Sequence, residues 1–203
     1  MATYHSTVFV PDGLGPAGDA LRAWNFRAGL EQCLQRANEG DVAARATAAW
    51  MLLVGVVDGE DLNRAEALAS TAAASGSAYA RYCLAWIRYE QDRLEESFDL
   101  MTQAASRDFV PAVMDLGRFY ASGTGTSRDL RKAERQFRSG SEKGHRLSTV
   151  FLFQLWVTGT CGPLKSLAAR ALLPVLHRYA AWYVTRHYFE EVGLVYNPSG
   201  MQK

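Results

Sequence analysis

An internal repeat of about 34 residues constrains the fold of this chain more than any other feature. Its clearest copy runs from Pro111 to Gly144 and reads as two helical segments joined by a glycine-rich turn. A shift of two periods superposes the following residues with identical or similarly small ones: Ala44, Ala49, Gly55, Asp61, Leu62, Ala65 and Gly76 match Ala112, Gly117, Gly123, Asp129, Leu130, Ala133 and Gly144. Such a period is typical of helix pairs that bury their apolar faces by stacking on one another. The repeat therefore predicts an all-α chain of stacked helix pairs.

Two weaker copies of the repeat lie between these two matching copies and after the second of them. The copy at 77–108 is shorter in the turn between its helices, which reads EQDR and contains no glycine, and the copy at 145–180 retains Leu152, Trp156 and Gly159. The expected layout is a lead-in at 1–18, an N-terminal capping helix at 19–40, repeat units at 41–76, 77–108, 109–144 and 145–180, a C-terminal capping helix at 181–196 and a tail at 197–203.

The matching positions have distinct packing roles. Small residues at 49, 85 and 117, and at 65, 133 and 169, are expected where the two helices of a pair approach closely, and large residues such as Leu116 and Phe137 are expected to fill the space between pairs. Asp61 and Asp129 are placed to cap the second helix of their units, while Gly76 and Gly144 are placed to end it.

Charge and composition exclude several classes of protein. The 203 residues include 22 basic and 21 acidic side chains, a net charge of +1 without a basic block, so nucleic acid is not an expected partner. The longest apolar stretch, 48–57, is ten residues, whereas a spanning helix needs about 20, and the first residues lack the features of a secretory signal. We therefore expect a cytoplasmic protein without a membrane association. Cys33, Cys83 and Cys161 are isolated, which argues against disulfides and against a zinc site.

The clearest copy also carries a specific family pattern. It reads A-x-x-x-L-G-x-x-Y-x-x-G-x-G-x-x-x-D-x-x-K-A-x-x-x-F, given by Ala112, Leu116, Gly117, Tyr120, Gly123, Gly125, Asp129, Lys132, Ala133 and Phe137. This pattern resembles the Sel1-like repeat (SLR) family, a relative of the tetratricopeptide repeat. The resemblance implies a right-handed α-solenoid. The repeat units give it about four helix pairs, and the segments outside the repeats, which carry no family signature, are expected to supply capping helices at both ends. The resemblance also implies an adaptor or scaffold for other proteins, with the first helices of the pairs lining a concave surface.

A stripe of aromatic residues marks the first helical segment of the second unit. Tyr79, Tyr82, Trp86 and Tyr89 recur at helical spacing, beside a second apolar stripe that contains Leu84. The family geometry would use the Leu84 stripe for packing and leave the aromatic stripe for a partner protein or peptide, because aromatic and arginine side chains are common interface anchors. Residues in the same register in the other units are Trp50, Met114, Arg118 and Gln154. The alternative, which the sequence leaves open, is that Tyr82 and Trp86 pack against the first helix of the adjoining unit.

A second aromatic group lies near the C-terminus. It consists of Tyr179, Trp182, Tyr183, Tyr188 and Phe189. These residues would either mediate self-association or docking, or seal the core of the last repeat.

Catalytic interpretations have little support in the sequence. The four histidines form no metal motif, the 123–125 Gly-Thr-Gly segment lacks the strand and the Lys-Ser/Thr of a phosphate loop, and nothing activates the Cys161 thiol. We expect no enzyme activity, no cofactor and no metal, and a non-enzymatic interaction scaffold. A dedicated toxin-immunity or secretion adaptor is the alternative. A more distant one is a β-lactam-binding hydrolase of the SLR type, but those proteins carry a cysteine pair in each repeat.

Overall fold

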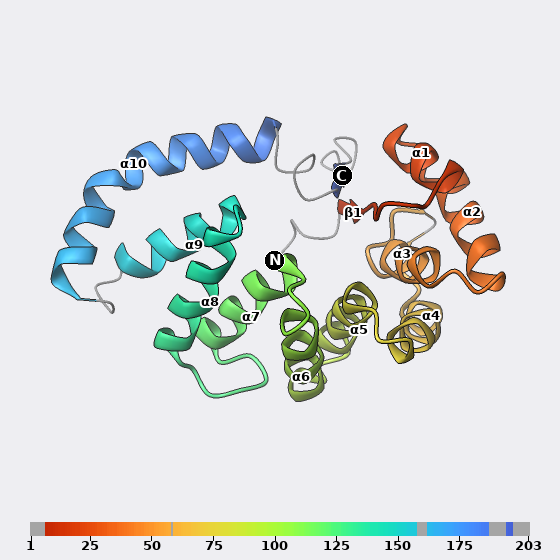
Figure 1. Ribbon diagram of the computed structural model, residues 1–203, viewed down its shortest axis with the longest axis horizontal. Helices are drawn as coiled ribbons and strands as arrows, with labels where there is room; N and C mark the ends of the chain where they lie inside the picture. Colours follow the sequence, from red (N-terminus) through yellow and green to blue (C-terminus); the bar gives the residue numbers. More distant parts are fainter. Residues whose placement is uncertain (1–6, 58, 158–161, 187–193, 197–203) are drawn as a thin grey trace. The chain divides into compact units, whose positions relative to one another are not determined.

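The computed structural model describes residues 7–57, 59–157, 162–186 and 194–196, and in β1, in β2 and in parts of α10 it describes the backbone alone. The elements, in chain order, are β1 (Thr7–Phe9), α1 (Pro16–Arg22), α2 (Phe26–Asn38), α3 (Val42–Leu53), α4 (Leu62–Ala74), α5 (Ala78–Glu90), α6 (Leu94–Ala105), α7 (Val110–Ser122), α8 (Leu130–Glu142), α9 (Arg146–Val157), α10 (Pro163–Arg186) and β2 (Leu194–Tyr196). The first three expected repeat ranges contain α3 and α4, α5 and α6, and α7 and α8, while the fourth contains α9 and only the first part of α10; Figure 1 shows these helices in chain order.

The chain divides into two compact units. The first contains the described residues up to Gln91 together with β2, and the second runs from Asp92 to Arg186. The boundary falls inside the short EQDR turn, where Asp92 has a φ of 59°.

In the first unit, consecutive helices from α1 to α5 pack against one another, and α3 also packs against α5. β1 and β2 pair antiparallel, with Val8 opposite Val195, and β1 lies against α3. The repeat pattern gave no indication of this two-stranded sheet. In the second unit, consecutive helices from α6 to α10 pack in the same way, around a core that includes Phe137, Leu152 and Leu155.

The predicted helix ends at Asp61, Asp129 and Gly144 and the predicted close approach at Gly117 are confirmed. The Asp61 carboxylate accepts a hydrogen bond from the backbone N–H of Arg64 at 3.0 Å, and Asp129 accepts one from Lys132 at 2.9 Å. Gly144 follows α8 with a φ of 80°. A Cβ added to Gly117 would lie 2.7 Å from Cε1 of Phe137, so the absence of a side chain on α7 is what lets α8 pack this closely.

The expectation of one N-terminal helix over 19–40 was wrong. Two helices, α1 and α2, occupy this part of the chain, and Trp24 between them has a φ of 62°. The Asn25 side chain accepts a hydrogen bond from the backbone N–H of Ala28 at 3.2 Å and so starts a new helix. Trp24, which helical spacing places on the apolar side, is 45% exposed.

The expectation of a separate C-terminal helix over 181–196 was also wrong. α10 continues through Pro174 to Arg186, so the second helix of the fourth unit includes the start of this segment, and Leu194–Tyr196 is a strand. Residues 187–193 and the tail at 197–203 lie outside the described part of the chain.

Candidate partner-binding surface

The structure joins four of the predicted aromatic residues into one ladder of ring contacts. Trp50 of α3 stacks on Tyr82 of α5, with ring centroids 5.7 Å apart and planes at 28°. Along α5, Tyr82 meets Trp86 edge to face at 6.4 Å, and Trp86 meets Tyr89 at 5.2 Å. Edge-to-face and offset-stacked pairs at these distances are favourable beyond the area that they bury.

Most of this ladder is buried. Trp50, Tyr82 and Trp86 are 5%, 9% and 8% exposed, and only Tyr89, at the end of α5, is half-buried. The Leu84 stripe of the same helix is buried as well, because α5 packs against both α3 and α4. Of the two interpretations that the sequence left open, the exposed fractions favour core packing for Tyr82, which lies against the first helix of the preceding repeat. Tyr89 has the most accessible ring of the stripe.

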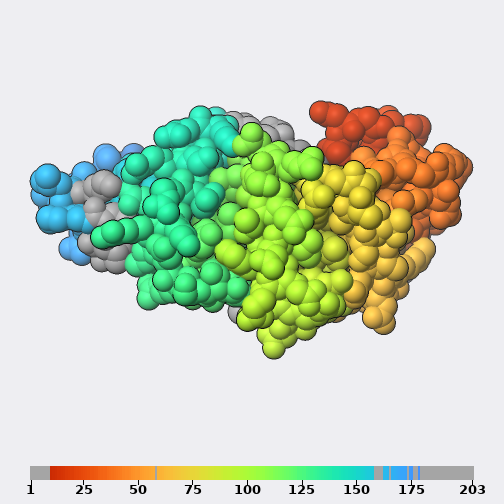
Figure 2. Space-filling view, turned by 60° about the horizontal axis from the view of Figure 1, so that its bottom comes forward, coloured from red at the N-terminus to blue at the C-terminus, as the bar shows by residue number. Residues whose placement is uncertain are grey.

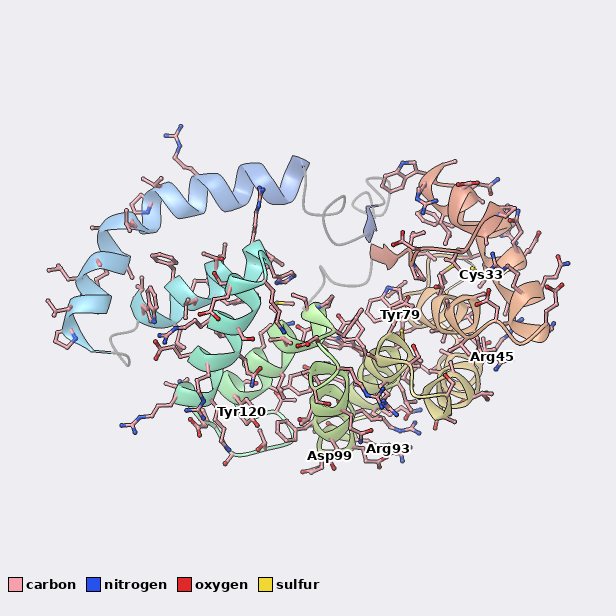
Figure 3. The ribbon with its side chains drawn as sticks, in the orientation of Figure 1. Cys33, Arg45, Tyr79, Arg93, Asp99 and Tyr120 are labelled. Atoms are coloured by element: carbon pink, nitrogen blue, oxygen red, sulfur yellow. The ribbon has the colours of Figure 1, made fainter. Side chains whose placement is uncertain are left out.

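Tyr79, the remaining member of the stripe, is buried. Figure 3 labels this residue on α5. Its hydroxyl group forms side-chain hydrogen bonds with Thr47 and with Cys83. Burial raises the pKa of Tyr79 well above its ordinary value, and burial likewise raises the pKa of Cys83. Burial also raises the pKa of the Cys33 thiol to about 11. Since thiolates are the reactive form, these cysteines are suited to structure and not to nucleophilic chemistry.

In the second compact unit, the predicted binding residues differ in their exposure to solvent. Met114 is 2% exposed and belongs to the core, whereas Gln154 of α9 is exposed and Arg118 of α7 is half-buried. The Arg118 guanidinium forms an ion pair with Asp115 at 2.8 Å and lies over the Phe151 ring, 5.8 Å from its centroid. The Asp115 carboxylate is fully buried, while the Arg118 side chain is 32% exposed. The position of the Arg118 guanidinium is therefore fixed by these two contacts, while part of its side chain remains accessible to solvent.

Sequence reasoning missed Asp115 and Phe151, the two residues that position Arg118. One signal was present, since an aspartate three residues before an arginine can pair with it on a helix, and here it interrupts an otherwise apolar run. A second missed contact ties α4 to α5: Glu66 forms an ion pair with the buried Arg88 and accepts a hydrogen bond from Gln91 at 2.5 Å.

The described residues contain no group of three or more His, Cys, Asp and Glu side chains that could hold a metal ion. The segment from 123 to 125 is the turn between α7 and α8, with positive φ at both glycines. Within the described part of the chain, none of the helices has the length and apolar character needed to cross a bilayer. Cys161, Tyr188 and Phe189 lie outside the described residues, and of Tyr179, Trp182 and Tyr183 only the backbone of α10 is described.

Solved structures share this arrangement of helices. A crystal structure of a Sel1 repeat protein from Oxalobacter formigenes matches with a TM-score of 0.63 over 77% of this chain and 67% of that one, at 20% sequence identity. The chain has the SLR fold. A second structure of this fold, of c5321, a protective antigen present in uropathogenic Escherichia coli strains, also matches with a TM-score of 0.63, over 87% of this chain, at 16% identity.

The chain spans 44% of the length of that antigen, and no family model or curated protein sequence matches it. The likeness confirms the expected all-α solenoid and the resemblance to SLR proteins. At these identities it shows the SLR fold alone.

Proposed function

We propose that this SLR-fold protein is a non-enzymatic scaffold that binds another protein or a peptide across the first helices of its pairs. The observation that carries the proposal is the Arg118 arrangement on α7 and α9, with the guanidinium fixed by Asp115 and Phe151 and partly exposed. Arginine is a frequent anchor of protein interfaces. Because its rotamer is already constrained, a partner that contacts it loses less conformational entropy on binding.

The burial of the aromatic ladder changes which residues we assign to the binding surface. Arg118 and Gln154 are accessible on α7 and α9, first helices of pairs in the second compact unit, and we assign these two residues to the binding surface. Tyr89 is a separate accessible aromatic residue of the first compact unit. We assign Met114 a supporting role in the core beneath this surface, and Trp50, Tyr79, Tyr82 and Trp86 a structural role in the core of the first compact unit.

Co-purification with mass spectrometry tests the proposal. The tagged protein is compared with an Arg118→Ala/Gln154→Ala variant and with a matched control, Arg131→Ala/Gln103→Ala, which changes the same residue types at exposed positions of the second helices α8 and α6. We expect a partner that is retained by the control and lost from the first variant, with helicity unchanged in both. Recovery of the same proteins with both variants would overturn the proposal.

The identity of the recovered partner also separates the two kinds of adaptor. A toxin or nuclease as the single abundant partner would indicate an immunity role. Components of a secretion system would indicate a delivery role.

A further inference from the structure

The last helix of the second unit, α10, carries an apolar face that is exposed to solvent. Among the described residues five large apolar side chains are exposed, and four of them lie on this helix: Leu164 at 82%, Leu167 at 70%, Leu172 at 48% and Val175 at 65%. Single exposed leucines are ordinary on a protein surface, but a contiguous group of them marks an interaction site.

Helical geometry aligns most of these residues into one stripe. The α10 stripe consists of Leu164, Leu167, Ala168, Ala171 and Val175. At 100° per residue these positions share one side of the helix, and they extend over about 17 Å. Ser166 and Ala169, which are 7% and 0% exposed, lie on the opposite side, and α10 packs against α9. Figure 2 shows blue atoms of α10 at the margin of its unit, beside the teal atoms that precede it in the chain.

The stripe combines small and large side chains in an arrangement that a second helix could pack against. Ala168 and Ala171 lie at its centre, with Leu164, Leu167 and Val175 around them. Two helices pack when ridges of large side chains on one fit the grooves left by small side chains on the other. In a stack of helix pairs, a further helix would cover this face, so an incoming helix would continue the pattern by which α9 covers α8.

The charge of α10 selects among possible occupants. The helix contains Lys165, Arg170, Arg178 and Arg186 and neither Asp nor Glu, and Arg170 and Arg178 are exposed. A second copy of α10 on this stripe would bring basic residues against basic residues, which disfavours self-pairing. A helix with carboxylates beside its apolar residues would be complementary in charge.

We propose that the α10 stripe binds an acidic amphipathic helix of a partner protein. Leucine side chains of that helix occupy the groove over Ala168 and Ala171, and its carboxylates lie near Arg178, which follows Val175 by three positions on the same side of α10. This site is separate from the Arg118 surface and does not depend on it.

Fluorescence anisotropy with the full chain tests this site. The probe is a synthetic helical peptide with leucines at the a and d positions of each heptad and glutamates at the outward positions, and the control peptide has lysines in place of the glutamates. We expect binding of the acidic peptide only. Replacing the apolar contacts in a Leu167→Ser/Val175→Ser variant should weaken it by about tenfold or more.

Charge is tested by a matched pair of variants. Arg178→Glu should weaken binding of the acidic peptide by about tenfold. Arg131→Glu, the same substitution at an exposed position of α8, should leave this binding unchanged. Arg118→Ala should also leave it unchanged, which separates this site from the proposed partner surface.

Three results would overturn the inference. The first is equal binding of the acidic and basic peptides, or no binding of either. The second is a dimer in sedimentation that the Leu167→Ser/Val175→Ser variant abolishes, since the occupant would then be a second copy. The third is binding to vesicles containing phosphatidylserine through the same residues without binding to the peptide, which would make the occupant an anionic lipid surface.

Discussion

Tyr79 shows how a single residue of the aromatic stripe serves the interior of the first unit. Its ring is buried, and its hydroxyl group makes hydrogen bonds with the side chain of Thr47 on α3 and with that of Cys83 on α5 itself. A buried hydroxyl without partners would cost free energy, and the bond to Thr47 links α5 to α3.

Tyr79→Phe should therefore lower the free energy of unfolding by about 1 kcal/mol, since it removes the hydroxyl and leaves the ring in place. Urea unfolding followed by circular dichroism measures this difference. Tyr89→Phe, at the half-buried end of the same helix, should have a smaller effect. Equal effects of the two substitutions would show that the Tyr79 hydrogen bonds contribute little.

The buried thiols give a pH dependence with a definite sign. Burial raises the pKa of Cys33 from 9.0 to about 11, so the folded protein keeps its proton where the unfolded chain loses it. The contribution of this thiol to the free energy of unfolding is fully present below pH 9. It is lost as the pH rises toward about 11, because the unfolded state then binds fewer protons than the folded state.

We accordingly expect neither Cys33 nor Cys83 to react with iodoacetamide in the native protein at pH 8, and both to react in urea. Peptide mapping by mass spectrometry gives the extent of modification at each cysteine. Rapid native alkylation at either position would contradict the structural role assigned to these thiols.

At the scale of the elements, the repeat pattern predicted helices well and the ends of the chain poorly. Asp61, Asp129 and Gly144 are local signals, since a cap or a left-handed residue acts on its own helix, and such signals can be read from sequence. The break at Trp24 and the continuation of α10 past 181 involve residues with no counterpart in the repeat. Apolar spacing alone does not distinguish one long helix from two shorter ones.

The candidate binding residues show the same limit for a different reason. Helical spacing placed Tyr82 and Tyr89 on one side of α5, but it gives no information about what covers that side. Trp50, on α3 of the preceding repeat, buries Tyr82. Asp115, a residue that the repeat pattern does not include, fixes Arg118. Burial in a stack depends on the neighbouring pair, so it became visible only with the structure.

The close contact between α7 and α8 gives a prediction for a helix pair. Gly117→Ala should lower the free energy of unfolding by about 1 to 3 kcal/mol, because the added Cβ would lie 2.7 Å from the Phe137 ring. Gly144→Ala should lower it by about 1 to 2 kcal/mol for a different reason, namely its φ of 80°.

A double-mutant cycle separates these two causes. Combining Gly117→Ala with Phe137→Leu should cost less than the sum of the single substitutions, since the smaller side chain makes room for the methyl group. Combining Gly144→Ala with Phe137→Leu should be additive. Additivity in both pairs would refute the steric account of Gly117.

At the scale of the whole molecule, the helices of each unit pack mainly against their neighbours in sequence. In such an arrangement, stability is close to a sum of local terms, and a local defect should loosen nearby helices first. We expect Gly117→Ala to speed amide hydrogen exchange in α7, α8 and α9 and to leave α2, α3 and α4 unchanged. A uniform increase along the chain, measured by mass spectrometry, would show that the chain unfolds as one cooperative body.

We propose that a partner binds on the first helices of the pairs, and site-specific photocrosslinking in cells tests this most directly. A benzophenone amino acid replaces Gln154, which is exposed on the first helix α9, and in a parallel strain it replaces Gln103, which is exposed on the second helix α6. We predict a discrete crosslinked partner from position 154 that Arg118→Ala abolishes, and none from position 103. A partner crosslinked from position 103 alone would contradict the account and place binding on the second helices.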